Sequence, residues 1–103
     1  MKKLIIYTFL LICTGVFAQE KDKFLPKAND EFAEKNYRDA EANYRLSQSK
    51  FTDKSTATYN LGNTIYKFNQ SAEAGQSYIK AAEKATTRPE KHKAFHNLGN
   101  VFM

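Results

Sequence analysis

Apolar residues recur every three or four positions along most of the chain beyond residue 20. Ala57, Leu61, Ile65 and Phe68 show this best, because steps of 4, 4 and 3 residues place their side chains on one face of a helix. No segment alternates apolar and polar residues with a period of two, so we predict no strands. The pattern predicts an all-α fold, with helices over residues 24–35, 37–50, 54–68, 71–86 and 89–103.

Short polar breaks separate the predicted helices. Lys35-Asn36 and Asn69-Gln70 each lie between two apolar faces, which is typical of the turn in an antiparallel helix pair. Residues 87–90, with the sequence Thr-Arg-Pro-Glu, predict a capping box, in which the threonine caps the helix and the glutamate bonds back to it. Pro26 must likewise lie in the first turn of its helix, since it would break the interior.

The chain repeats itself in two registers. Residues 60–63, Asn-Leu-Gly-Asn, return at 97–100, a shift of 37 positions. Residues 36–44 align with residues 70–78 at a shift of 34 positions. Because periods of about this length mark repeat architectures, each repeat is expected to be one helix pair.

The repeated residues resemble the tetratricopeptide (TPR) pattern, whose period is also 34. The resemblance implies a right-handed solenoid of antiparallel helix pairs, with about two and a third repeats over residues 21–54, 55–91 and, incomplete, 92–103. Paired helices approach closely only where small residues face each other, with larger residues packed beside them. The positions expected to pack the repeats are Ala28, Ala40, Tyr44, Leu61, Gly62, Ala74, Tyr78, Ala81, Leu98 and Gly99.

TPR arrays bind a peptide or a partner helix in a groove, and the resemblance predicts such a groove here. Asparagine amides can bond a ligand backbone without reading its side chains, whereas the alternative is that they satisfy backbone groups between helices. A carboxylate clamp of the TPR type is matched at few positions. The candidate groove residues are Asn29, Phe32, Tyr59, Asn60, Asn63, Tyr66, Lys93, Asn97 and Asn100.

Three further segments, residues 27–30, 45–51 and 91–103, are similar to the BatC-like TPR family of bacterial aerotolerance (Bat) operons. That resemblance implies a non-catalytic scaffold in a periplasmic, membrane-associated assembly linked to oxidative stress. The implied partners are membrane proteins with von Willebrand A domains. The alternative is a periplasmic sensor segment of a longer signalling protein.

The first 18 residues have the order of a secretory signal peptide. Lys2 and Lys3 precede an apolar run over residues 4–17, which is shorter than the roughly 20 residues of a membrane span. We expect cleavage after Ala18, so that residues 19–103 form an exported repeat domain. An uncleaved anchor is one alternative. Lipidation of Cys13 is another, although Ile12 before it is larger than the usual small residue.

Cleavage would also change the composition. It would remove 18 of the 103 residues, including two lysines, so the net charge of +5 would fall to +3. This mild excess lacks the clustered basic stripe of a nucleic-acid-binding protein, so we expect no nucleic-acid partner. The chain's one cysteine would leave with the signal, which excludes disulfides and thiol chemistry in the mature protein.

No motif predicts an enzyme, a metal site or a cofactor. His92 and His96 lie four residues apart on a predicted helix, but zinc needs three or four ligands. The acidic pairs Glu31/Glu34 and Asp39/Glu41 are expected on solvated helix faces. A metal-dependent activity remains the catalytic alternative.

The predicted third repeat has one helix only. Its apolar residues Phe95, Leu98 and Phe102 would have a neighbour on one side. Solenoids usually need about three repeats and a polar cap. Two interpretations remain open: the sequence is part of a longer chain, or this edge associates with a partner or a second copy.

Overall fold

The computed structural model describes residues 20–103, and the predicted signal peptide with Cys13 lies outside this range. The all-α prediction is confirmed for the described residues, which form five helices and no strand. Four of the predicted helices end within one or two residues of the observed bounds, and the 54–68 helix is two residues shorter at each end. The helices are α2 (Phe24–Ala33), α3 (Tyr37–Lys50), α4 (Thr56–Tyr66), α5 (Ser71–Lys84) and α6 (Arg88–Val101).

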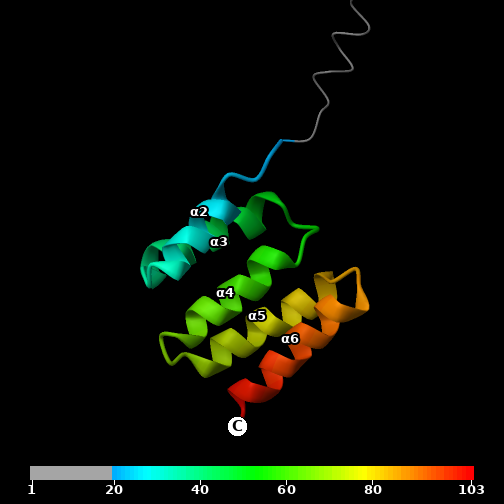
Figure 1. The fold of residues 1–103 in the computed structure, drawn as a ribbon. Helices are drawn as coiled ribbons and strands as arrows, with labels where there is room; N and C mark the ends of the chain where they lie inside the picture. The colour runs from blue at the N-terminus through cyan, green and yellow to red at the C-terminus, as the bar shows by residue number, and fades with distance from the viewer. Residues whose placement is uncertain (1–19) are drawn as a thin grey trace, which may run out of the picture.

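Each helix packs mainly against the helices that precede and follow it in the chain. Neighbouring helices run in opposite directions, so the chain passes back and forth across the molecule (Figure 1). The turns at Lys35 and Asn69 adopt the left-handed conformation, with φ of 64° and 60°. A residue in this conformation ends a helix and reverses the chain. The turns predicted at these two positions are therefore confirmed.

Asp22 lies two residues before the start of α2 and was not among the predicted capping residues. Its Oδ1 accepts hydrogen bonds from the backbone N–H groups of Phe24 (2.9 Å) and Leu25 (3.1 Å). The hydroxyl of Ser47, in α3, donates to the other carboxylate oxygen. Burial raises the pKa of Asp22, but these hydrogen bonds outweigh burial and hold it below its ordinary value. One carboxylate thus both caps α2 and joins it to α3.

The capping box of α6 is confirmed in one direction and altered in the other. Thr87 Oγ1 accepts the Glu90 N–H at 3.4 Å, as predicted. The Glu90 carboxylate, however, accepts from the Ser55 hydroxyl (2.8 Å) and the Thr86 N–H (3.4 Å) rather than from the Thr87 N–H. The bond to Ser55 is the largest of the interactions that lower the pKa of Glu90. It links the start of α6 to the start of α4.

The core is built mostly from small side chains. Eight of the twelve buried apolar residues are alanines, and the four larger ones are Tyr44, Leu61, Ile65 and Tyr78. Alanines at helix crossings let the helix axes approach closely, which is how this fold buries a core with few large residues. The two tyrosines consequently supply much of the buried volume.

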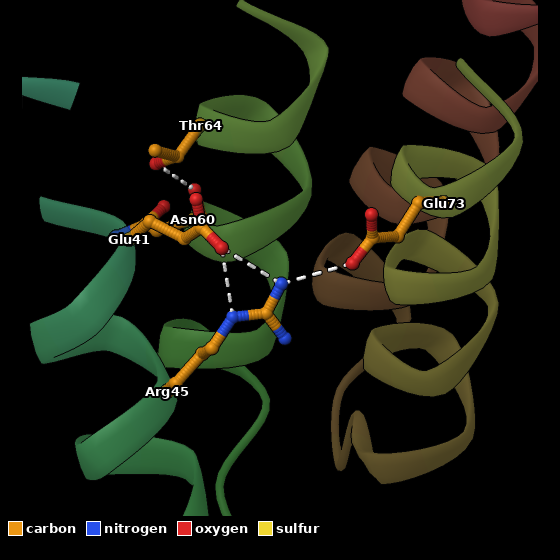
Figure 2. Close-up of polar contacts among 5 residues, drawn as sticks. All are labelled: Glu41, Arg45, Asn60, Thr64 and Glu73. Carbon is orange, nitrogen blue, oxygen red and sulfur yellow. Dashed lines mark hydrogen bonds and ion pairs between the residues drawn. The ribbon is translucent and has the colours of Figure 1, made fainter. Parts of the chain in front are cut away.

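Arg45 connects helices that are not adjacent in the chain. Its guanidinium lies 2.9 Å from Glu41, one turn earlier in α3, and 2.9 Å from Glu73 in α5. Figure 2 shows the side chain reaching from α3 to the carboxylate on α5. All three side chains are substantially exposed, so solvent screens the pairs and their net contribution is small.

Candidate functional site

A tyrosine and two asparagines form the first half of the site. The Tyr44 hydroxyl, from α3, donates to Asn29 Oδ1 on α2 at 2.6 Å. The Asn60 amide, from α4, donates to the same oxygen at 3.1 Å. One asparagine oxygen therefore joins three successive helices.

The same arrangement recurs one repeat later. The Tyr78 hydroxyl, from α5, donates to Asn63 Oδ1 on α4 at 2.5 Å, and the Asn97 amide, from α6, donates to it at 3.2 Å. Asn97 also donates to the hydroxyl of Tyr59 at 2.6 Å. In both copies the asparagine precedes its tyrosine by 15 residues. The internal repetition of the sequence is thus also a repetition of hydrogen bonds.

Burial of the two tyrosines makes these bonds important. Tyr44 and Tyr78 are almost wholly buried, and burial raises the pKa of each hydroxyl to about 12. A buried hydroxyl without a partner is costly, so each asparagine oxygen stabilises the fold. The asparagines do satisfy groups between helices, as one sequence interpretation held. The groups are tyrosine hydroxyls and other asparagine amides, however, rather than backbone atoms.

Some polar atoms of the same asparagines remain available. Within residues 20–103, the Nδ2 atoms of Asn29 and Asn63 donate to no protein group. The Oδ1 atoms of Asn60 and Asn97 accept no hydrogen bond from the described residues. Each repeat therefore presents one amide donor and one amide acceptor. A peptide group offers the complementary carbonyl and N–H.

These atoms border linked hollows, which together we call the asparagine groove. A hollow of about 190 Å³ is lined by Asn29, Tyr44 and Asn60 and shares Phe32 and Asn63 with the next. The next, of about 270 Å³, is also lined by Tyr66, Lys67, Tyr78, Asn97, Asn100 and Val101. A small third hollow, of about 70 Å³, shares Asn60 with the first as a lining residue. Tyr59 and Lys93 also line it. All nine residues predicted for the groove line one of these hollows.

Aromatic and basic side chains flank the asparagines. The Lys93 ammonium lies 5.0 Å from the centroid of the Tyr59 ring, a cation–π distance. Phe32 packs edge-on against Tyr37 at 5.3 Å between ring centroids. Tyr66 is 45 % exposed, and its ring is free to contact a ligand. The groove thus combines peptide-like polar groups with apolar walls, as ligand sites generally do.

Comparison with family models, with curated proteins and with solved structures finds no match to this chain. Within residues 20–103, every helix is too short or too polar to cross a membrane.

The other candidate residues lie apart from the groove or are already bonded. His92 and His96 are exposed, and the described residues include no cluster of three or more potential metal ligands. Glu31 accepts a hydrogen bond from Asn43 at 2.5 Å, and Asp39 accepts one from Asn36 at 2.7 Å. These two carboxylates therefore support the helices.

The residues predicted to pack the repeats differ in their surroundings. Ala28, Ala40 and Ala74 are fully buried, and Leu61 is nearly so. Gly62 lies directly against Tyr78, since a Cβ added there would be 2.7 Å from the tyrosine ring. The helix crossing expected at Gly99 stays a prediction, because no described helix lies against that position. A Cβ at that position would have no neighbour within 4 Å.

Sequence reasoning missed the part that the tyrosine hydroxyls play in the groove. Tyr44 and Tyr78 were expected only as packing residues, yet each fixes the asparagine oxygen that lines a hollow. The constant spacing of 15 residues between asparagine and tyrosine was the available signal. Lys67 and Val101 were also missed, and neither belongs to a repeated motif.

Proposed function

We propose that this protein is a non-catalytic scaffold whose asparagine groove binds an extended segment of a protein partner. The observation that carries the proposal is the repeated pair of unused amide groups, Asn29 with Asn60 and Asn63 with Asn97. Each pair offers a donor and an acceptor that suit one peptide group of a ligand. Because the two pairs lie in successive repeats, at shifts of 34 and 37 positions, they favour a ligand that runs along the groove over a small molecule.

The wider setting of this function is also a proposal. The TPR-like motifs support a solenoid of helix pairs, and the basic and apolar start of the sequence supports export with cleavage after Ala18. The BatC-like segments favour a periplasmic assembly with membrane proteins that carry von Willebrand A domains, linked to oxidative stress tolerance.

Site-specific photo-cross-linking in native membranes tests the groove. Tyr66 and Ile79 are matched sites, with 45 % and 43 % of each residue exposed, but only Tyr66 lines the groove. We expect a photoreactive residue at position 66 to give a discrete cross-linked partner, and the same residue at position 79 to give none. Mass spectrometry of the adduct would identify the partner and the segment captured.

Two outcomes would count against the proposal. Equal cross-linking at positions 66 and 79 would show that the groove is not the binding surface. A specific adduct with a protein that lacks a von Willebrand A domain would leave the groove supported and exclude the proposed Bat-type assembly.

A further inference from the structure

Three aromatic rings lead out of the asparagine groove and across two of the turns between helices. Phe32, which lines both larger hollows, packs edge-on against Tyr37 at 5.3 Å between ring centroids. Tyr37 in turn packs edge-on against Phe68 at 6.5 Å. Tyr37 follows the α2–α3 turn and Phe68 lies in the α4–α5 turn, so these turns lie side by side at one edge of the molecule (Figure 1). The three half-buried rings form an apolar path from the groove to this edge.

Two cations lie over these rings. The Arg38 guanidinium is 5.6 Å from the centroid of the Phe68 ring, and the Lys67 ammonium is 6.0 Å from that of Tyr37. Each cation therefore stacks on a ring of the neighbouring helix pair, and both are held at the same edge. Both side chains are exposed, and no ion pair among residues 20–103 includes either of them. We call Phe32, Tyr37, Phe68, Arg38 and Lys67 the turn strip.

The two larger hollows of the groove differ in the charge beside them. Near the hollow of about 190 Å³, Glu31 accepts a hydrogen bond from Asn43. Burial raises the pKa of Tyr44, which lines this hollow, and the charge of Glu31 raises it further. The hollow of about 270 Å³ is lined by one charged residue within the described chain, Lys67. Acidic groups of a ligand are therefore disfavoured beside the first hollow and favoured beside the second.

The larger hollow can also hold a side chain of the ligand. Phe32, Tyr66 and Val101 contribute apolar surface to its lining, and its volume is about 270 Å³. An apolar cavity of about 150 Å³ is large enough to bind benzene. An aromatic or large aliphatic side chain therefore fits this hollow, and its neighbours in the ligand would lie close to Lys67.

We propose that the turn strip binds acidic side chains of the segment held by the asparagine groove, next to a large apolar residue that occupies the larger hollow. The inference rests on the proposed function, because the groove must hold the segment. It adds the chemistry of that segment, with aspartate or glutamate on one side of the apolar residue. Their carboxylates pair with Arg38 and Lys67, which the rings already hold in place. The continuity of the strip with the groove favours this occupant over an anionic lipid surface.

Selection from a random peptide library tests this chemistry. Short peptides displayed on phage are selected on the chain and then synthesised as C-terminal amides, so that no terminal carboxylate contributes. We expect the selected peptides to carry a large apolar residue with several acidic residues on one side of it, and to bind more weakly at high salt. NMR shifts of the side-chain amides of Asn29 and Asn63 report independently whether a peptide occupies the groove.

Matched charge variants locate the acidic residues on the strip. Arg38→Glu with Lys67→Glu should weaken peptide binding by about tenfold or more and remove most of its salt dependence, since repulsion replaces attraction. Arg88→Glu with Lys80→Glu makes the same change in net charge at exposed positions outside the strip and the hollows, so affinity should change less than about twofold. If the first variant does not fold, Arg38→Gln with Lys67→Gln should give a smaller loss in the same direction.

The outcomes separate this inference from the groove function. Selected peptides that lack acidic residues but shift the Asn29 and Asn63 amides would overturn the inference and leave the groove function intact. Equal weakening by the two charge variants would overturn it as well, because net charge alone would then explain binding. If no selected peptide shifts these amides, the inference and the groove function both fail. Binding to phosphatidylglycerol vesicles that requires Arg38 and Lys67, while peptide binding does not, would assign the strip to a membrane surface instead.

Discussion

Replacing Tyr78 with alanine is expected to destabilise the chain by about 3–5 kcal/mol, the usual cost of removing a large buried aromatic side chain. A domain of this size has a free energy of unfolding on the order of 5–15 kcal/mol. The variant should therefore melt far below the wild type or be largely unfolded. Circular dichroism during urea unfolding would measure the change.

The size of this effect follows from the composition of the core. Most buried apolar residues are alanines, so neighbouring side chains are too small to collapse into the space that Tyr78 would leave. The ring also packs on Gly62 and lies 5.7 Å from the ring of Tyr59. Its loss would affect α4 and α5 together.

Tyr78→Phe separates the ring from the hydroxyl. It keeps the packing and removes one hydrogen bond to Asn63, so a loss of about 1 kcal/mol is expected.

The wild type should also lose stability between about pH 10 and pH 12. An unfolded tyrosine ionises near pH 10, whereas burial raises the pKa of Tyr78 to about 12. Stability from this group is complete below the lower value and falls as pH rises. Tyr78→Phe should lose less stability than the wild type over this pH range. Equal losses would contradict the raised pKa of Tyr78.

The two glycines of the repeated Asn-Leu-Gly-Asn motif should respond to alanine in opposite directions. A Cβ at Gly62 would lie 2.7 Å from the buried ring of Tyr78, so Gly62→Ala must displace packed atoms. Overpacking of this kind costs about 1–3 kcal/mol, less the roughly 0.5–1 kcal/mol that alanine gains over glycine within a helix. Together these ranges give an expected net loss of up to about 2.5 kcal/mol.

Gly99→Ala should stabilise the free chain by up to about 0.5–1 kcal/mol, because an added Cβ would meet no atom within 4 Å beyond its own helix backbone and only the helix preference acts. Paired thermal melts of Gly62→Ala and Gly99→Ala measure the difference in stability between the two variants. This difference does not depend on the absolute stability of the wild type. A loss of stability in Gly99→Ala would show that α6 is covered by another part of the protein.

Much of the fold could be predicted because it depends on local pattern. The apolar period identifies every helix, and the polar breaks at Lys35 and Asn69 mark the left-handed turns. The cap at Asp22 was overlooked, although the N–H groups that it accepts lie only two and three residues away. Its bond to Ser47, 25 residues away in the sequence, could not be predicted from a local pattern. The bond from Ser55 to the carboxylate of Glu90 likewise joins residues that are 35 positions apart, so a local pattern could not predict it.

The residues that line the candidate site could be predicted from the sequence, but the hydrogen bonds between them could not. Equivalent positions in successive repeats identify Asn29, Asn63, Asn60 and Asn97 together. Repeat periodicity cannot say which amide atoms are used within the fold. That depends on the tyrosine hydroxyls, which reach the asparagines only when the helices pack at the observed distance.

The most direct test of the account uses the double variant Asn29→Asp with Asn63→Asp. Aspartate keeps the oxygen that accepts from each tyrosine hydroxyl and removes the two unused amide donors. We expect the melting temperature to change little. Affinity for the partner segment identified by cross-linking at position 66 should fall about 10- to 100-fold, since each lost hydrogen bond is worth roughly 1 kcal/mol. Unchanged affinity in a folded double variant would contradict the claim that the asparagine groove binds the partner.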